Sequence, residues 1–407
     1  MNNNQNTTPN VVFIGAKGTG KTTTIEKLWN RNSNFFQTIE YIEGRGNIVY
    51  NVKELPYISF SIEDEINKWV EQPDNNSTLR NADVIVLLIP IDKITFSRQA
   101  KFIKQLKSVG VLKEGSYIII GLSQIESLVD INEFQNKKII TLEDCSKIIH
   151  KKTKFFKEFD RYIDNEYFDI TKVIPFSYMA DWQLNEIKEA IIEGVIKRHN
   201  ELIYNQKCPT VVFIGKTGCG KSSTINTLCG TSLPVDGAIA CTKFPIVINK
   251  DVLYNNSSKR VNIVDLPGIA ESLEANIIYA DYYNKYIKKA NVVVFLSQAN
   301  TRAYLQEEDF FNELIDTGII GQHSKIILGI NKIDLLFKSD KHLEGIDLSE
   351  ITDDDPLIKE KINDYYDSVF SLIFKSIENV NRDSVVVYSN LQNWNLDKLS
   401  NKIFLNL

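Results

Sequence analysis

The chain has 407 residues, of which 43% are hydrophobic and 24% are charged, proportions typical of a soluble globular protein with two or three domains. Its formal net charge of −5 and isoelectric point near 5.6 argue against a broad nucleic-acid surface, so no DNA footprint is expected. Five scattered cysteines form no C-x-x-C pair, and the four histidines show no metal-ligand spacing. This usage predicts reduced thiols in a cytoplasmic protein, without a disulfide framework or a zinc site.

The chain begins with a polar segment, MNNNQNTTPN, which lacks the basic and apolar parts of a secretion signal. Residues 1–10 are therefore predicted to be a disordered lead. No apolar run reaches the length of about 18 residues that a membrane span requires. We also find no basic amphipathic helix, and expect no attachment to a membrane surface.

A fifteen-residue pattern occurs twice, as VVFIGAKGTGKTTTI at 11–25 and VVFIGKTGCGKSSTI at 211–225, with ten positions identical. Each copy is an apolar run, typical of a strand buried on both faces of a parallel sheet, followed by the P-loop pattern G-x-x-x-x-G-K-[ST]. Its glycines let backbone N–H groups point at phosphate oxygens. Its lysine reaches the terminal phosphates, and its Ser or Thr hydroxyl can bind Mg²⁺.

The sequence therefore predicts two phosphate-binding loops. In the second copy the nucleotide-binding residues are Gly215, Thr217, Gly218, Cys219, Gly220, Lys221, Ser222 and Ser223. In the first copy they are Gly15, Lys17, Gly18, Thr19, Gly20, Lys21, Thr22 and Thr23. The predicted metal ligands among them are Ser222 and Thr22.

Apolar segments after each P-loop also match in order. The matched pairs are residues 82–90 with 290–298, 117–126 with 325–334, and 173–184 with 385–396. Short apolar runs alternate with longer amphipathic stretches, which is typical of β-α-β units and a mostly parallel sheet. Such sheets bind ligands at the carboxyl ends of their strands.

One helix is predicted at 182–206 from its apolar stripe, and Cys208-Pro209 interrupts the chain before the next strand. We expect the domain boundary near residue 205, giving domains at 11–205 and 206–407. The predicted fold class is α/β, with two tandem P-loop NTPase domains, each a mostly parallel β-sheet flanked by helices.

Two positions after the second P-loop are suited to the γ-phosphate and its cation. Thr242 can offer a hydroxyl and a carbonyl to Mg²⁺ and the γ-phosphate. In the sequence Asp265-Leu266-Pro267-Gly268, the carboxylate can hold Mg²⁺ through water and the Gly268 N–H can sense the γ-phosphate. The predicted metal ligands of the second copy are therefore Ser222, Thr242 and Asp265.

Two later strand ends are suited to a guanine base. In Asn331-Lys332-Ile333-Asp334, the Asp334 carboxylate can accept from the two donors on the guanine edge, and the Lys332 stem can cover the ring. Ser389 ends the next strand and can support this loop. Adenine offers an acceptor where guanine offers donors, so ATP would leave the carboxylate unpaired.

This ordered series resembles the Era-like, or TRAFAC, branch of P-loop GTPases over most of residues 208–407. The tandem arrangement is similar to EngA-type double G domains, although a C-terminal RNA-binding domain is not expected here. The segment around Thr242 and Asp265 is similar to that of bacterial defence-associated GTPases. The resemblance implies binding of GTP or GDP with Mg²⁺, and hydrolysis in which Lys221, Thr242 and Gly268 assist in-line attack by water.

Hydrolysis is expected to be slow. Ile269 stands where some GTPases carry a water-orienting Gln, and Gly218 stands where others carry an Asn that holds a potassium ion. Arg302 could serve as an arginine finger or could be a solvated residue at a helix start. A partner, a second protomer or the first domain could otherwise supply the missing group.

The first copy is expected to be a pseudo-GTPase that retains weak nucleotide binding without hydrolysis; the alternative is that it binds no nucleotide. Ser123-Gln124-x-Glu126 replaces the base-reading motif, and Glu is one methylene longer than Asp, so guanine selectivity should be weak or lost. Equal spacing aligns Thr38 with Thr242 and places Ser61-Ile62-Glu63-Asp64 at the position of the Asp265 motif. On this alignment the magnesium-side Asp and the γ-sensing Gly are both absent, and Asp64 could substitute for the Asp only in a shifted register.

Two classes of function remain open from the sequence. One is a GTP-dependent switch whose loops order on the γ-phosphate. The other is an interaction protein in which GTP or GDP is a structural ligand and holds a homodimer together through the G-domain face, as in septins and immunity-associated GTPases. Neither class identifies a protein partner.

Overall fold

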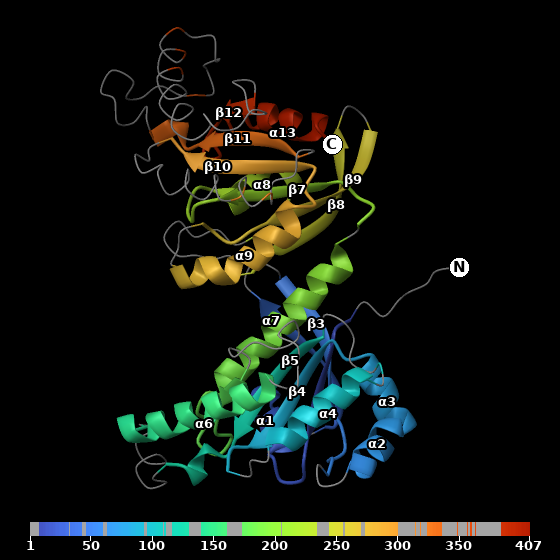
Figure 1. Ribbon diagram of the computed structural model, residues 1–407. Helices are drawn as coiled ribbons and strands as arrows, with labels where there is room; N and C mark the ends of the chain where they lie inside the picture. The colour runs from blue at the N-terminus through green and yellow to red at the C-terminus, as the bar shows by residue number, and fades with distance from the viewer. Residues whose placement is uncertain are drawn as a thin grey trace. The chain divides into compact units, whose positions relative to one another are not determined.

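In the computed structural model, the described residues are 8–31, 33–42, 46–59, 63–92, 96–108, 110, 116–129, 140–160, 173–204, 206–233, 244–254, 257–269, 273–299, 314, 318, 324–335, 348, 356, 359, 363 and 384–407. The chain divides into two compact units. The first comprises Met1–Glu40 and Asn47–Glu201, and the second comprises Tyr41–Gly46 and Leu202–Leu407. Each unit carries a six-stranded sheet with helices beside it (Figure 1).

The first unit has the strand order β2-β3-β1-β4-β5-β6. Its strands are β1 (Asn10–Gly15), β2 (Phe35–Ile42), β3 (Gly46–Glu54), β4 (Val84–Pro90), β5 (Tyr117–Ser123) and β6 (Val173–Pro175). The α-helices described in this unit are α1 (Lys21–Trp29), α2 (Glu63–Glu71), α3 (Pro73–Arg80), α4 (Phe96–Ser108), α6 (Leu142–Asp160) and α7 (Leu184–Ile203). Strand β1 pairs in parallel with β3 and β4, and β5 pairs in parallel with β4 and β6.

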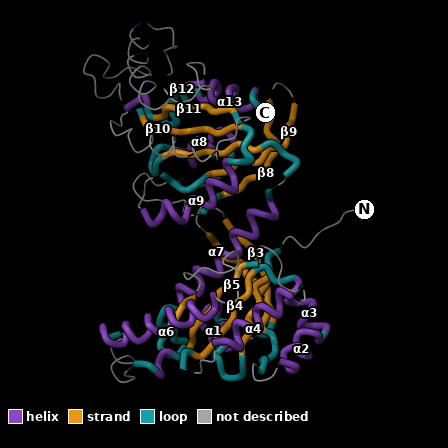
Figure 2. Tube along the Cα trace, viewed as in Figure 1, coloured by secondary structure: helices purple, strands orange, loops and turns teal. Residues whose placement is uncertain are grey.

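The second unit repeats this order as β8-β9-β7-β10-β11-β12. Its strands are β7 (Thr210–Gly215), β8 (Ile246–Tyr254), β9 (Ser257–Asp265), β10 (Val292–Gln298), β11 (Lys325–Asn331) and β12 (Val385–Val387). Its α-helices within the described residues are α8 (Lys221–Cys229), α9 (Leu273–Ile287) and α13 (Leu396–Leu405). Only β8 is antiparallel among its described strand pairs, and Figure 2 shows helices flanking the strands of each unit. The predicted α/β fold class is confirmed.

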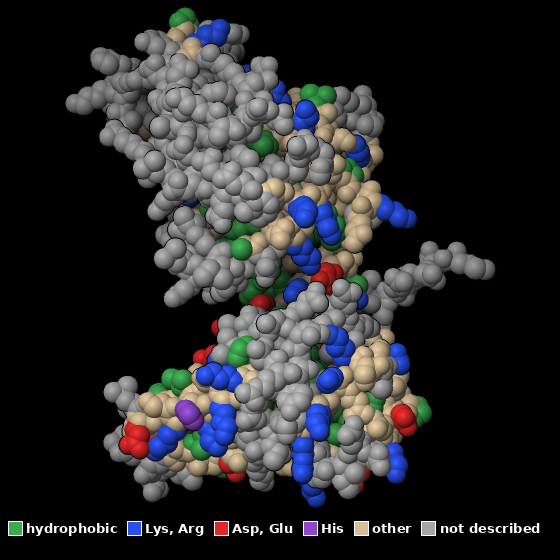
Figure 3. All heavy atoms as spheres, in the orientation of Figure 1, with side chains coloured by type: hydrophobic (Ala, Val, Ile, Leu, Met, Phe, Trp, Pro, Cys, Tyr) green, Lys and Arg blue, Asp and Glu red, His purple; other side chains and the backbone are tan. Residues whose placement is uncertain are grey.

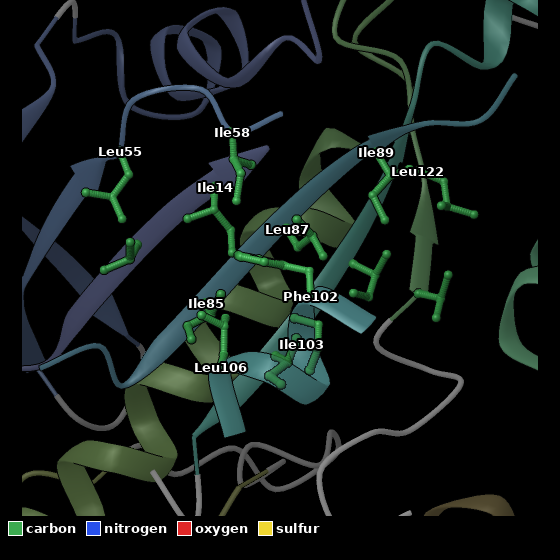
Figure 4. Close-up of a cluster of buried hydrophobic side chains, with 14 of the residues drawn as sticks. Ile14, Leu55, Ile58, Ile85, Leu87, Ile89, Phe102, Ile103, Leu106 and Leu122 are labelled. Carbon is green, nitrogen blue, oxygen red and sulfur yellow. The ribbon is translucent and has the colours of Figure 1, made fainter. Parts of the chain in front are cut away.

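The strands that lead into the P-loops, β1 and β7, are apolar over residues 11–14 and 211–214 because both faces of the sheet are covered. In β7, Val212 and Ile214 belong to one buried cluster, while Val211 and Phe213 belong to the cluster on the other face. This alternation follows from the two-residue period of a strand. In the first unit, Ile14, Leu87 and Phe102 of the corresponding core lie together between the sheet and α4 (Figure 4).

The strand register corrects one sequence alignment. Phe13 pairs with Glu54 as Phe213 pairs with Asp265, so Glu54-Leu55-Pro56-Tyr57 occupies the position of Asp265-Leu266-Pro267-Gly268. Backbone hydrogen bonds agree: the Leu55 N–H donates to Phe13 O at 3.0 Å, and the Leu266 N–H donates to Phe213 O at 3.2 Å. The alignment that placed Ser61-Ile62-Glu63-Asp64 there was wrong.

The error arises in the loop before the second strand. Residues 30–34 join α1 to β2, whereas the longer segment 230–245 joins α8 to β8. Equal spacing therefore assigned Thr38 to the position of Thr242, but Thr38 lies inside β2. Surface loops tolerate such insertions, while the hydrogen-bonded strands keep their register.

The predicted helix at 182–206 corresponds to α7. None of the helices within the described residues is long and apolar enough to span a membrane. On the face shown in Figure 3, Lys and Arg side chains of the described residues are dispersed over each unit.

Candidate functional site

The second P-loop lies between β7 and α8 in a backbone conformation that requires glycine. Gly215, Gly218 and Gly220 have φ values of 145°, 79° and 98°. A Cβ on Gly215 would lie 2.2 Å from Leu296 O, so the loop packs tightly against β10. These turns direct the chain into α8, whose first residue is Lys221.

Lys221 is held under this loop with 6% of its side chain exposed. Its Nζ donates to Gly215 O at 2.9 Å and to Lys216 O at 3.1 Å. A buried ammonium with carbonyl partners is positioned to exchange one of them for a phosphate oxygen. Of the other predicted residues, Thr217 lies in the loop, Cys219 is buried beneath it, and Ser223 lies in the first turn of α8.

A hydroxyl and a carboxylate meet on the cation side of the loop. Ser222 Oγ donates to Asp265 Oδ2 at 2.6 Å, and Asp265 is the last residue of β9. Both groups are oxygen ligands of the kind that Mg²⁺ prefers, with phosphate oxygens and water completing its shell. The described residues therefore fit a nucleotide-bound Mg²⁺.

The remaining γ-phosphate residues are placed in part. Gly268 follows β9, and the next residue, Ile269, donates its N–H to Gly215 O at 3.2 Å. This bond brings the loop after β9 beside the P-loop. Thr242 and Arg302 lie outside the described residues.

The loop predicted to read the base is hydrogen-bonded to the P-loop, which lies more than one hundred residues earlier in the sequence. Asn331 Nδ2 donates to Cys219 O at 3.0 Å, and Lys332 Nζ donates to Gly218 O at 2.7 Å. Lys332 itself has a φ of 63°, and Asn331 Oδ1 accepts its N–H at 2.8 Å. The left-handed turn is thus stabilised by the side chain that also holds the P-loop.

The carboxylate expected to read the base is held in place from the neighbouring strand end. Ser389 Oγ donates to Asp334 Oδ1 at 2.5 Å, and Asp334 is 3% exposed. The residues predicted to bind the phosphates, the cation and the base therefore lie together at the carboxyl ends of β7, β9, β11 and β12.

Sequence reasoning missed two contributors, Asn390 and Gln298. Asn390 N–H donates to Asn331 Oδ1 at 3.2 Å, and its Nδ2 donates to Thr224 Oγ1 at 2.7 Å. Gln298 Oε1 accepts from Lys332 Nζ at 3.1 Å. The only available signals were their positions. Asn390 directly follows Ser389 at a strand end, and Gln298 is the last residue of β10.

The first unit has a related P-loop. Lys21 is 7% exposed. Its Nζ donates to Gly15 O at 3.2 Å and lies 3.9 Å from Glu54 Oε1. Burial lowers the pKa of Lys21, and the nearby Glu54 charge acts in the opposite direction. Thr22 Oγ1 lies 3.0 Å from both Glu54 carboxylate oxygens. A carboxylate is therefore present on the cation side, contrary to the sequence expectation.

The other predicted residues of this loop keep the same order. Gly18 and Gly20 have φ values of 77° and 84°. Thr19 Oγ1 donates to Ala16 O at 3.0 Å. Lys17 lies in the loop, and Thr23 lies in the first turn of α1.

The base side of the first unit uses different residues for similar contacts. Gln124 has a φ of 63°, as Lys332 does, and its Nε2 donates to Gly18 O at 2.7 Å. Ser177 Oγ donates to the Glu126 carboxylate, and burial raises the pKa of Glu126. Ser123 is too short to replace the Asn331 amide: its Oγ is buried and has no hydrogen-bond partner among the described residues.

Comparison with known proteins gives a family match in the second unit. A family described as "50S ribosome-binding GTPase" matches residues 210–332. The uncharacterized protein YkfA of Escherichia coli (strain K12) is 30% identical over 152 residues, which are 37% of this chain and 50% of that protein. GTPase Der of Thermodesulfovibrio yellowstonii is 23% identical over 348 residues, covering 80% of this chain and 68% of Der.

A solved structure of Era from Aquifex aeolicus bound to GDP.AlF4- is 22% identical, with a TM-score of 0.35, and covers 49% of this chain and 56% of that chain. The chain spans half the length or less of the first two curated relatives that it matches. The ordered motifs, their mutual contacts and the family match agree on residues 210–332. This chain therefore carries a G domain of the TRAFAC class of P-loop GTPases.

Proposed function

We propose that the protein is a cytoplasmic GTP-dependent switch whose second domain, residues 206–407, binds GTP with Mg²⁺ and hydrolyses it slowly. The observation that carries the proposal is the preformed connection between the base-reading loop and the P-loop through Asn331 and Lys332. Asp334, held by Ser389, is suited to the two donors on the guanine edge. Binding of one nucleotide would therefore engage both loops at once.

The residues of this chain act on the terminal phosphates in distinct ways. Lys221 Nζ would give up its hydrogen bond to one of its two carbonyl partners and would neutralise β- and γ-phosphate oxygens instead. Ser222 and Asp265 would hold Mg²⁺. Mg²⁺ would supply charge neutralisation at the phosphates. We assign the Gly268 N–H and Thr242 to the γ-phosphate, where their loops would order with GTP and relax after hydrolysis.

Slow turnover is supported by the position of Ile269. The Ile269 side chain is 3% exposed and packs in the core with Leu266. The Ile269 backbone N–H donates a hydrogen bond to Gly215 O. Ile269 therefore offers no group that could orient the attacking water. A missing stabilising group of the arginine-finger kind is worth about 10³ to 10⁵ in rate, so a partner could accelerate the reaction strongly.

Multiple-turnover GTP hydrolysis by the full chain tests this assignment. We expect Lys221→Ala to lower the rate by about 10² to 10³-fold, because a charge that stabilises the transition state is removed. Lys21→Ala is the matched control in the other P-loop and should leave the rate unchanged. An equal loss of hydrolysis rate in both variants, or a loss only in Lys21→Ala, would contradict the assignment of GTP hydrolysis to the second domain.

The second candidate function is a nucleotide-stabilised assembly protein, and it is favoured by the buried, already bonded state of Lys221 and Asp334. In that case GTP or GDP would co-purify and would not turn over. The size of the protein in solution, measured with GDP and with a non-hydrolysable GTP analogue, distinguishes the switch from the assembly protein. A nucleotide-dependent dimer would indicate assembly through the G-domain face, and an unchanged monomer would exclude it.

A further inference from the structure

We propose that the first unit is a second guanine-nucleotide site, in which Glu54 serves the cation side and Glu126 reads the base. Its ligand would be a magnesium-bound guanosine di- or triphosphate. The sequence indicates a degenerate site here, because neither acidic residue stands in a recognisable motif. Binding at this site involves residues other than those of the second unit, so it does not depend on hydrolysis there.

The phosphate and cation end is complete in its side-chain chemistry. Lys21 is an almost fully buried ammonium with three donors; Gly15 O accepts one, and Glu54 lies 3.9 Å away. The Thr22–Glu54 contact at 3.0 Å repeats the Ser222–Asp265 contact at 2.6 Å. The same hydroxyl, carboxylate and ammonium are thus presented at the same strand ends.

Glu126 stands where Asp334 does, and its carboxylate accepts from the equivalent serine, Ser177. The extra methylene therefore does not remove the contact that orients the acid. Guanine presents two adjacent donors, N1–H and the 2-amino group, to a carboxylate in this position. Adenine presents an acceptor at N1, which would face the carboxylate without a proton between them.

Tyr178 replaces the connection that Asn331 makes in the second unit. A Cβ on Gly220 would lie 2.3 Å from Asn331 Nδ2, and a Cβ on Gly20 would lie 2.2 Å from the Tyr178 ring. The Tyr178 hydroxyl accepts from Gln124 Nε2 at 3.1 Å, and the same Nε2 donates to Gly18 O. The Tyr178 ring thus lies against Gly20 as the Asn331 amide lies against Gly220, and Gln124 links the base loop to the P-loop.

The γ-phosphate side differs in one respect. Tyr57 occupies the position of Gly268, with 60% of its side chain exposed. An exposed aromatic ring replaces the small residue that we assign to γ-phosphate sensing in the second unit. The first unit is therefore expected to retain its nucleotide without responding to hydrolysis.

Binding stoichiometry of the full-length protein, stripped of nucleotide, tests the site. With Lys221→Ala inactivating the second P-loop, equilibrium dialysis against GDP and Mg²⁺ should give one GDP per chain. Adding Lys21→Ala should reduce this to none. No GDP bound by the Lys221→Ala variant would overturn the proposal, while hydrolysis by the Lys21→Ala variant would separately report on the second unit.

Base selectivity tests the role of Glu126. In the Lys221→Ala background, Glu126→Gln places an amide donor against the 2-amino group of guanine, whereas xanthine offers a carbonyl there. We expect GDP affinity to fall about 10- to 100-fold and xanthosine diphosphate affinity to rise. Asp334→Asn in the Lys21→Ala background is the matched control and should show the same inversion.

Two further outcomes complete the test. An unchanged ratio of GDP to xanthosine diphosphate affinity in Glu126→Gln would show that this carboxylate does not read the base. Glu54→Gln should lower GDP affinity with Mg²⁺ present and have little effect in EDTA. Equal effects in both conditions would contradict a cation-side role for Glu54. The gain of xanthosine diphosphate binding also shows that the Glu126→Gln variant is folded.

Discussion

A buried pair of hydroxyl groups distinguishes the second unit at the scale of single residues. Thr224 Oγ1 and the Tyr388 hydroxyl lie 2.8 Å apart, and Thr224 also donates to Gly220 O. Burial raises the pKa of Tyr388 far above its ordinary value, so the phenol stays neutral. The corresponding positions of the first unit are Thr24 and Phe176, and Thr24 Oγ1 has no hydrogen-bond partner among the described residues.

Tyr388→Phe should lower the free energy of unfolding of the second unit by about 1 kcal/mol, because a buried hydrogen bond is lost while the ring remains. Urea titration followed by circular dichroism measures the change. Phe176→Tyr in the first unit is the reciprocal variant, and it should not destabilise, since Thr24 would gain a partner. A Tyr388→Phe protein as stable as the parent would show that the pair contributes nothing.

Close packing of α7 on the first sheet is the clearest constraint at the scale of elements. Gly194 lies in this helix, and a Cβ there would lie 2.7 Å from the Tyr117 ring and 2.8 Å from Val84 Cγ2. Val84 is the first residue of β4, and Tyr117 is the first residue of β5. A glycine in mid-helix is therefore explained by the close approach of the helix to the sheet.

Gly194→Ala should destabilise the first unit by about 1 to 3 kcal/mol, because the added methyl overpacks this contact. The effect is opposed by the better helix propensity of Ala, worth about 1 kcal/mol. Thermal unfolding of the variant measures the balance. Glu189→Ala, at an exposed position of the same helix, is the control and should change stability by less than about 0.5 kcal/mol. A rise in stability for Gly194→Ala would show that the sheet yields to the methyl.

At the scale of the whole molecule, two units share one strand order and differ in the residues around their P-loops. If each holds a nucleotide by its own contacts, ligand binding should stabilise each independently. Hydrogen–deuterium exchange resolves the units by peptide. With GDP and Mg²⁺, we expect slower exchange at residues 211–225 in Lys21→Ala and at residues 11–25 in Lys221→Ala.

Protection confined to 211–225 in every protein would contradict a first-unit site while leaving the second intact. If residues 11–25 and 211–225 were both protected from exchange in Lys21→Ala and in Lys221→Ala, neither lysine would be required for nucleotide binding. Each result therefore assigns the nucleotide to named residues.

The positions of most residues in the candidate site of the second unit were predictable because these residues lie in short motifs at strand ends. Lys221, Asp265, Asn331, Lys332 and Asp334 follow apolar runs whose period and composition identify strands. Asn390 was not predictable, since nothing in its immediate sequence indicates that it contacts Thr224 or Asn331.

The sequence by itself determined the two P-loop patterns, the order of elements and the α/β class, because apolar runs and glycine-rich turns are local features. Only the tertiary structure decided that Glu54 stands at the position of Asp265, and that Glu126 contacts Ser177 while Tyr178 packs on Gly20. The physical reason is that strand pairing fixes register through backbone hydrogen bonds, whereas the loop between helix and strand can change length freely.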